Sequence, residues 1–142
     1  MRQITFFILT LTTLLISLVV FKSKKGNKKV IERTEALPEI IDLVISGLQA
    51  GMSISETLAN LGNIGPRCVN QIFSEFELNL RKSGNFELEL NQLKKEFQDS
   101  QADQFLETLI YANKFGSSNA IKILHELSEF VSEDLSLRGE IS

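Results

Sequence analysis

Residue types that support covalent or metal chemistry are scarce in this 142-residue chain, which contains one cysteine, Cys68, and one histidine, His125. Nucleophilic catalysis would need Cys68 or a serine activated by His125, with a third group to orient the imidazole, and no spacing in the sequence connects such a set. We therefore interpret His125 as an ordinary residue of a helix surface or core edge. A zinc site needs four ligands, commonly Cys and His, so we expect no metal cofactor.

Two other patterns typical of enzymes are weak or absent. Glu87 and Glu89 resemble a two-carboxylate site, but residues i and i+2 of a helix point in different directions, so a solvated acidic face is the simpler interpretation. The phosphate-binding pattern GxxxxGK[ST] does not occur in the sequence. We therefore expect a protein that is not an enzyme, binds no cofactor and hydrolyses no ATP by a P-loop mechanism.

The N-terminal part of the chain contains an 18-residue run without charge, ITFFILTLTTLLISLVVF, from Ile4 to Phe21. This is about the minimum for a membrane-spanning helix, roughly 27 Å at 1.5 Å per residue. A cleaved signal peptide is the alternative, but its apolar region is usually about 7 to 15 residues long and ends in small residues. Here the run ends in Val19, Val20 and Phe21. The sequence therefore predicts an uncleaved transmembrane anchor over residues 1–21.

Basic residues flank the predicted span unevenly. Arg2 alone precedes it, and five lysines follow it within the juxtamembrane linker that we assign to residues 22–36: Lys22, Lys24, Lys25, Lys28 and Lys29. The positive-inside rule then places the rest of the chain in the cytoplasm and the N-terminus outside. The lysines also suit anionic lipid head groups, although a topology signal with no further role explains them as well. GNKK, residues 26–29, is expected to be a short flexible hinge.

Acidic residues dominate the chain after the lysine cluster. Residues 30–142 contain nine Lys and Arg and all 18 Asp and Glu, which gives a net charge of −9. Nucleic-acid binding needs a Lys/Arg-rich face that releases counterions, so this balance argues against a nucleic-acid partner. A single cysteine permits no intrachain disulfide, which is consistent with a reducing compartment.

Apolar residues recur at helical spacing along residues 37–142, and no segment alternates with period two for long enough to form a strand. We therefore expect an all-α fold, with an N-terminal transmembrane helix followed by a compact antiparallel bundle of about six short helices. Connections of about 2 to 5 residues are expected to join them. The helices on either side of Gly51 should bury their apolar faces against the long third, fifth and sixth helices of the bundle.

Specific turn and cap residues mark the expected helix ends. Gly51 suits the left-handed C′ position after the first helix of the bundle, and Gly84 and Gly116 end later helices. Ser53 and Glu56 match a capping box. In that motif the serine oxygen accepts the amide N–H of the third helical residue, and the glutamate accepts the N–H of the serine.

Three finer assignments concern the later helices. Gly62 and Gly65 are expected to interrupt the second helix of the bundle. Ser100 and Asp103 are the expected caps of the fifth helix. Phe115 and Phe130 fall on apolar stripes and are expected to face the core.

Two stretches of the sequence resemble the type II secretion F domain. LPEIIDLVISGLQAGMSISETL, residues 37–58, is similar to the first helix-turn-helix of that family, which has an apolar helix starting at LP, then AG, a serine and a second helix. ETLIYANKFGSSNAIKILHEL, residues 107–127, is similar to the matching later element. The long helix between them, residues 66–83, agrees in spacing. The resemblance covers about residues 37–137 and points to the TadB/TadC-like proteins of tight-adherence (Flp) pili.

This resemblance implies that residues 37–142 form a cytoplasmic helical domain of a single-pass platform protein in the bacterial plasma (inner) membrane. Such a platform couples a separate hexameric secretion ATPase to the assembly of pilin subunits. The implied partners are that ATPase in trans and sister platform subunits, in a homo- or hetero-oligomer. Family members normally continue into further membrane helices. We therefore expect this chain to be a truncated product or a shorter member that completes its platform with a partner subunit.

A membrane-tethered helical signalling or sensor module is the alternative function. Such modules usually propagate signals through long coiled coils, in which the heptad pattern continues for three or more repeats. Glycines interrupt the helical pattern of this chain too often for such repeats. We therefore prefer the platform hypothesis.

The predicted topology is tested with a cysteine introduced at Ser142 in a Cys68→Ser background. In intact cells this cysteine should remain unlabelled by a membrane-impermeant thiol reagent, because the basic residues around the span place the C-terminal part in the cytoplasm. Labelling after permeabilisation is the positive control. Labelling in intact cells would contradict the orientation.

Overall fold

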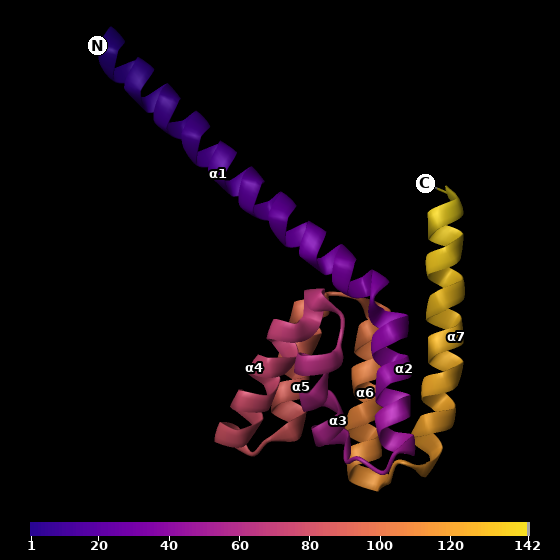
Figure 1. The fold of residues 1–142 in the computed structure, drawn as a ribbon. Helices are drawn as coiled ribbons and strands as arrows, with labels where there is room; N and C mark the ends of the chain where they lie inside the picture. The colour runs from indigo at the N-terminus through magenta and orange to yellow at the C-terminus, as the bar shows by residue number, and fades with distance from the viewer. Residues whose placement is uncertain (142) are drawn as a thin grey trace.

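The computed structural model describes residues 1–141, with side chains described for all of these except residues 23–25, 140 and 141. This part of the chain contains seven α-helices and no strand (Figure 1), which confirms the all-α fold and the six helices after the anchor. The helices are α1 (Arg2–Glu35), α2 (Leu37–Gln49), α3 (Ile54–Ile64), α4 (Arg67–Ser83), α5 (Phe86–Phe97), α6 (Ser100–Phe115) and α7 (Ser118–Ile141).

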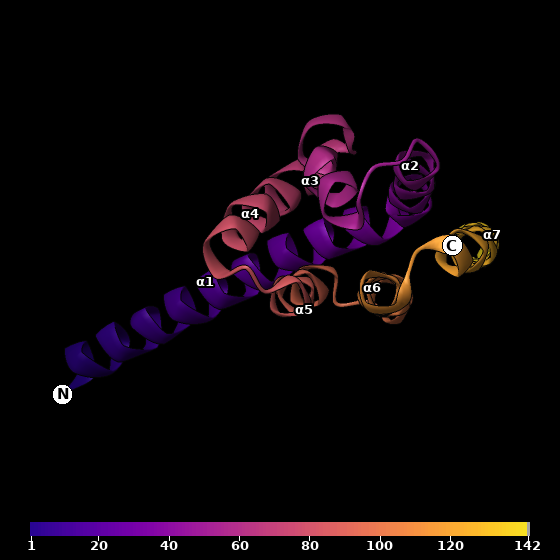
Figure 2. The ribbon, with the colours of Figure 1, turned by 90° about the horizontal axis from the view of Figure 1, so that it is seen from below.

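Helices α2 to α7 form two layers of three helices each. Figure 2 shows α4, α3 and α2 in one layer and α5, α6 and α7 in the other, so each helix lies beside the next one in the sequence. Contact between α4 and α5 closes one edge, and contact between α2 and α7 closes the other. At the second edge the hydroxyl of Ser128 donates to Asp42 Oδ1 at 2.7 Å. Connections of two to four residues between consecutive helices keep them adjacent.

The apolar residues of the two layers meet in one core. Its largest fully buried side chains come from α2 to α7: Leu37, Ile40, Ile41, Leu58, Leu61, Phe73, Leu90, Phe97, Phe105, Leu106, Leu109 and Leu124. Aromatic pairs join α4 to α5 across the closed edge. The ring centroids of Phe73 and Phe97 are 6.4 Å apart, and those of Phe76 and Phe86 are 6.2 Å apart in an edge-to-face arrangement. Such pairs contribute about 0.5–1.5 kcal/mol each beyond the burial of their area.

The turn after α2 contains the predicted left-handed glycine. Gly51 has φ 89°, and its N–H donates to the carbonyl of Leu48 at 3.1 Å. The N–H of Met52 donates to the carbonyl of Gly47 at 3.0 Å. These two bonds make a Schellman motif, which pairs two carbonyl groups that the helix end would otherwise leave free. The prediction for Gly51 is confirmed.

The other two predicted turn glycines also have a positive φ, although only Gly84 is in the left-handed helical region, and the predicted capping box is present. Gly84 follows α4 with φ 63°, and Gly116 follows α6 with φ 105°. At the start of α3, the Oγ of Ser53 accepts the N–H of Glu56 at 3.1 Å, and Glu56 Oε2 accepts the N–H of Ser53 at 2.9 Å. Both bonds of the predicted capping box are therefore present. The hydrogen bonds from Ser53 lower the pKa of the Glu56 carboxyl.

The predicted interruption at Gly62 is wrong, because α3 continues through this residue to Ile64. A Cβ at Gly62 would lie 2.5 Å from Ser74 Oγ and 3.1 Å from the backbone nitrogen of Ser74 on α4. Gly47 has a similar place between α2 and α3, where a Cβ would lie 2.6 Å from the Cγ2 of Thr57. These two glycines let neighbouring helices approach closely.

Helix α6 begins at a different cap from the predicted one. Asp99 is the N-cap, and its carboxylate accepts the N–H groups of Gln101 and Ala102, both at 3.0 Å. Ser100 and Asp103 therefore lie inside the first turn of α6. The carboxylate of Asp99 satisfies two free N–H groups at once and lies at the positive end of the helix dipole, which a serine hydroxyl does less well.

Two aromatic residues that the sequence placed in the core are exposed. Phe115 is 71% exposed at the last position of α6, where its ring packs on Tyr111 with centroids 4.7 Å apart. Phe130 is 55% exposed. Helix α7 buries a narrow stripe that includes Leu127 and Val131, and Phe130 is turned away from Val131 by about 100°.

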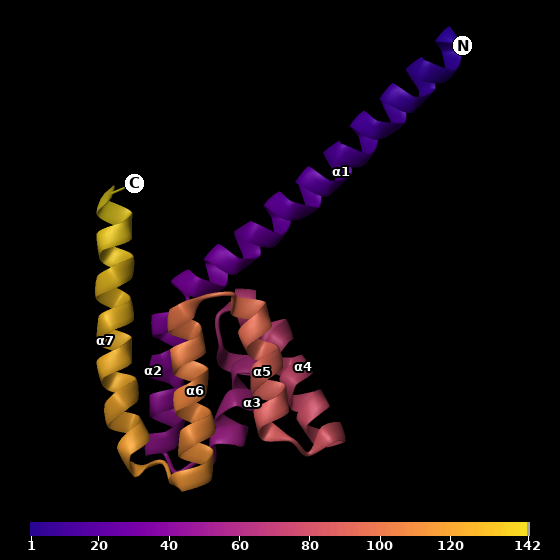
Figure 3. The ribbon, with the colours of Figure 1, turned by 180° about the vertical axis from the view of Figure 1, so that it is seen from behind.

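The predicted hinge at residues 26–29 is also wrong, because α1 is one helix of 34 residues, about 51 Å long. Lysine is a good helix former, and Gly26 weakens a helix by only about 0.5–1 kcal/mol relative to alanine. The predicted anchor and the predicted linker are therefore parts of one helix. Figure 1 and Figure 3 show α1 leaving the bundle obliquely, with the C-terminal end of α7 extending on the same side of the bundle.

Gly51→Val and Gly116→Val should each lower the melting temperature of the detergent-solubilised protein. No atom lies within 4 Å of a Cβ at either site, so the cost comes from the positive φ, about 1–2 kcal/mol for a residue with a side chain. Gly26→Val is the matched control, since that position is equally open and has no positive φ. If Gly51→Val and Gly116→Val had the same melting temperature as Gly26→Val, this account of the turns would be contradicted.

Candidate functional site

The apolar part of α1 lies outside the bundle. Residues 1–22 are all exposed, and α1 is the one helix in the described part of the chain that is long and apolar enough to cross a membrane. The polar side chains within this stretch are paired locally. For example, the hydroxyl of Thr10 donates to the carbonyl of Phe6 at 3.0 Å, and that of Thr12 donates to Leu9 at 2.9 Å. Such pairing suits hydrocarbon, where an unpaired polar group is costly.

The other end of α1 packs on the bundle. Thr34 is buried, and Val30 and Arg33 are half-buried, whereas Ile31 remains exposed. The contacts of this end are with α4, α5 and α2. Since α4 and α5 belong to different layers, the last turns of α1 lie against the edge where the two layers meet.

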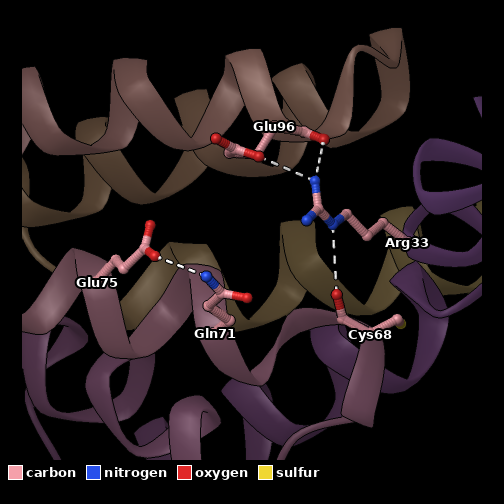
Figure 4. Close-up of polar contacts among 5 residues, drawn as sticks. All are labelled: Arg33, Cys68, Gln71, Glu75 and Glu96. Atoms are coloured by element: carbon pink, nitrogen blue, oxygen red, sulfur yellow. Dashed lines mark hydrogen bonds and ion pairs between the residues drawn. The ribbon is translucent and has the colours of Figure 1, made fainter. Parts of the chain in front are cut away.

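Arg33 makes the polar contacts of this junction (Figure 4). Its Nε donates to the carbonyl of Cys68 at 3.3 Å, in the first turn of α4. One terminal nitrogen donates to both the carbonyl and the Oε2 of Glu96, each at 2.9 Å, in the last turn of α5. The side chain of Arg33 is 13% exposed and that of Glu96 is 48% exposed, so the guanidinium is largely buried while its ion pair stays open to water on the Glu96 side. We call this set of contacts the Arg33 clamp.

The Arg33 clamp suits the chemistry of guanidinium. The carbonyl of Glu96 lies at the negative end of the α5 dipole, where a cation is favoured. A planar fork of N–H donors reaches two helices at once, which a lysine ammonium on its flexible stem does less well. Hydrogen bonds to a charged group contribute about 1.5–3 kcal/mol each. The clamp therefore joins α1 to both layers of the domain.

Sequence reasoning missed Arg33, although a signal was present. Val30 lies three residues before Arg33 and Leu37 lies four residues after it, and with Thr34 these three residues are all at least half-buried. An arginine on such a face has to find acceptors within the protein. Treating residues 22–36 as a linker hid this pattern.

Cys68 lies beside the clamp and is not arranged as a nucleophile. Its thiol is partly buried and lies 3.7 Å from the carbonyl of Glu32, to which it can donate. Burial is the main cause of the raised pKa of the Cys68 thiol, so the reactive thiolate is disfavoured. His125 is exposed on α7, at the other side of the bundle from α4 (Figure 2). The structure does not bring this cysteine and this histidine together.

Glu87 and Glu89 have different surroundings, and the predicted solvated acidic face is wrong at Glu89. Glu87 is exposed and pairs with Lys114 of α6 at 2.8 Å, which lowers the pKa of the Glu87 carboxyl. Glu89 is only 7% exposed. Its place was visible in the sequence, because Glu89 lies three residues after Phe86 and four before Leu93, on the apolar stripe of α5.

The lysine cluster that the sequence assigned to the membrane surface lies on α1 just after the apolar run. Lys22, Lys28 and Lys29 are exposed. The side chains of Lys24 and Lys25 lie outside the described ones. The three described lysines form no ion pair with other described side chains, so they are free to meet anionic groups.

No group of three or more His, Cys, Asp or Glu residues in the described part of the chain could hold a metal ion. The site that the geometry does define is mechanical: an exposed apolar helix joined through Arg33 to a two-layer domain. Comparison with protein-family models, with curated proteins and with solved structures finds no match to this chain.

Arg33→Ala should lower the free energy of unfolding of the detergent-solubilised protein by about 1.5–3 kcal/mol, because it removes the charge-assisted bonds of the clamp. Arg33→Lys should recover only part of this loss, since it keeps the charge without the fork. Lys29→Ala on the same helix is the control, as its side chain is exposed. If chemical denaturation gave Arg33→Ala the stability of the control, the clamp would not hold the junction.

Proposed function

We propose that the chain is a non-enzymatic, membrane-anchored platform component of a type II secretion or tight-adherence (Flp) pilus assembly system. In this role α1 crosses the bacterial inner membrane once, and α2 to α7 lie in the cytoplasm. The domain recruits a separate secretion ATPase and sister platform subunits and transmits force between the motor and the assembling pilin. This identification rests on the resemblance of residues 37–58 and 107–127 to the type II secretion F domain.

The observation that carries the proposal is the continuity from the apolar span of α1 to the Arg33 clamp. A platform has to hold its cytoplasmic domain in a fixed position under the membrane while a motor acts on that domain. A helix that is unbroken from Arg2 to Glu35 and bonded to α4 and α5 supports such a mechanical role. A flexible linker would dissipate the same force.

Charge supports the proposed arrangement at the membrane. The exposed lysines on α1 lie just beyond the apolar run, where each contributes about 1 kcal/mol of attraction to an anionic leaflet. The remainder of the chain, residues 30–142, carries a net charge of −9 and is repelled by that leaflet. The domain is therefore held at the membrane by α1 and presents its acidic surface to a basic partner.

A membrane-tethered signalling or sensor module is the second candidate. The continuous α1 favours this candidate too, since a helix that runs from the span into the domain would transmit a rotation or a shift. The two candidates differ in what the domain binds. A platform recruits a motor, whereas a sensor changes the state of its own domain or of a sister copy.

Recruitment of the cognate secretion ATPase to membrane vesicles that contain the full-length protein tests the proposal. We expect co-sedimentation at 0.1 M salt that weakens at 1 M, where the Debye length falls from about 10 Å to about 3 Å. Vesicles without the protein are the control. The protein alone should turn over no ATP.

Two outcomes would overturn the proposal. ATP turnover by the purified protein without the ATPase would refute its non-enzymatic character. Failure of the membrane-embedded protein to recruit the ATPase at either salt concentration would favour the sensor module.

A further inference from the structure

A groove runs between α4 and α5, on the side of the junction where Figure 4 shows Glu75 and Glu96. Its volume is about 270 Å³, and its apolar wall includes Ile72, Phe76 and Leu93. Carboxylates from both helices line the same groove. The combination of an apolar wall and acidic groups is the environment that a long cationic side chain requires, because its stem is apolar and its head is charged.

Glu89 gives the groove its specificity. This residue lines the groove and is 93% buried, yet its carboxylate has no hydrogen bond or ion pair with any other described residue. The other acidic residues of the groove are already engaged. Glu96 is bonded to Arg33, and Glu75 Oε1 accepts a hydrogen bond from Gln71 Nε2 at 3.0 Å. The carboxylate oxygens of Glu89 keep some contact with solvent, but that contact is small, so an added cation gains more from pairing with this carboxylate than with a fully hydrated one.

We propose that this groove binds an arginine side chain of a partner protein. The guanidinium pairs with Glu89 and reaches Glu75 at the rim, while the aliphatic stem lies against Phe76 and Leu93. Arginine fits better than lysine because its planar fork of donors can serve two acceptors at once. Lys95 also lines the groove, but it is exposed and leaves Glu89 unpaired.

Charge selects the type of partner. Residues 30–142 carry a net charge of −9, so two copies of the domain repel each other and a basic partner surface is favoured. A metal ion is a poor occupant, since the described residues offer no cluster of three or more metal-ligating side chains. The inference requires only that the domain has a protein partner, and it does not depend on that partner being a secretion ATPase.

The groove also adjoins the Arg33 clamp. Glu96 lines the groove and accepts two hydrogen bonds from Arg33. The stem of the proposed arginine lies against Leu93, which is three residues before Glu96 on α5. A partner arginine would therefore lie within one helical turn of Glu96, the residue that accepts hydrogen bonds from Arg33. Partner contact and membrane attachment share one edge of the bundle.

The test uses the full-length protein in phosphatidylcholine nanodiscs and an acetylated, amidated pentapeptide with one arginine among four alanines. We expect saturable amide chemical-shift changes on α4 and α5, and no such changes with the same peptide carrying citrulline, which has the shape of arginine without its charge. Glu89→Gln should weaken arginine-peptide binding about tenfold or more, the effect of losing a charge-assisted hydrogen bond. Glu126→Gln, at an exposed position on α7, is the matched control and should bind as the native protein does.

Thermal melting of the same variants separates a binding role from a structural one. Glu89→Gln should leave the melting temperature unchanged or raise it, because the Glu89 carboxylate makes no hydrogen bond or ion pair with another described residue that the amide would lose. A lower melting temperature would show that Glu89 supports the fold and would overturn the proposal.

Other results would assign the groove to a different occupant and would also overturn the proposal. Equal chemical-shift changes with the arginine and citrulline peptides, or undiminished binding by Glu89→Gln, would show that the charge of Glu89 does not contribute to binding. Much tighter binding of spermidine would indicate a small-cation site. Concentration-dependent self-association that Glu89→Gln abolishes would assign the groove to a second copy of the chain.

Discussion

The three hydrogen bonds of Arg33 connect two parts of the chain that follow different physical rules. The apolar part of α1 is stable where water is absent, and α2 to α7 are stable because water drives their apolar faces together. Arg33 lies 12 residues beyond the end of the apolar run at Phe21, in the part of α1 that packs on the bundle. Its guanidinium donates to carbonyls at the start of α4 and at the end of α5, so α1 meets the domain where its two layers close. The orientation of every other surface relative to α1 follows from this contact.

Much of the bundle is held by ordinary packing of apolar helix faces, and a charged residue on such a face is an exception to this packing. Glu87 is paired with a lysine of the next helix, whereas Glu89, two residues later, is buried without a partner. A protein selected for stability alone would replace such a residue with an apolar one of similar size. The charge of Glu89, in a groove with an apolar wall, is the feature on which the proposed binding of a partner arginine depends.

Local backbone chemistry was the most predictable level of this fold. Gly51 and the Ser53/Glu56 capping box follow from rules that involve only neighbouring residues, and their geometry agrees with the structure. Gly62 followed a different rule. Helix α3 continues through Gly62, and the position has no room for a side chain because Ser74 of α4 lies close by. No local pattern in the sequence reports the distance to another helix.

Burial was predictable for the centre of each apolar stripe and less so at its margins. Phe115 lies past the covered part of α6, and Phe130 lies beside the buried stripe of α7, so both are exposed although their spacing is helical. The candidate site was the least predictable part. Arg33 lies in a segment whose lysines and glycine are typical of a linker. Glu89 was predicted to be exposed like its neighbour Glu87, although its spacing from Phe86 and Leu93 places it on the apolar stripe of α5.

The unbroken course of α1 fixes the rotation of the domain relative to the apolar run. Each residue of an α-helix turns the chain by about 100°, so inserting one residue between Phe21 and Arg33 would turn the groove to a different direction around the α1 axis. An insertion of seven residues, about two turns, would restore the direction to within about 20° while moving the domain about 10 Å farther from the apolar run. The length of this helix therefore sets both the direction in which the domain faces around α1 and its distance from the apolar run.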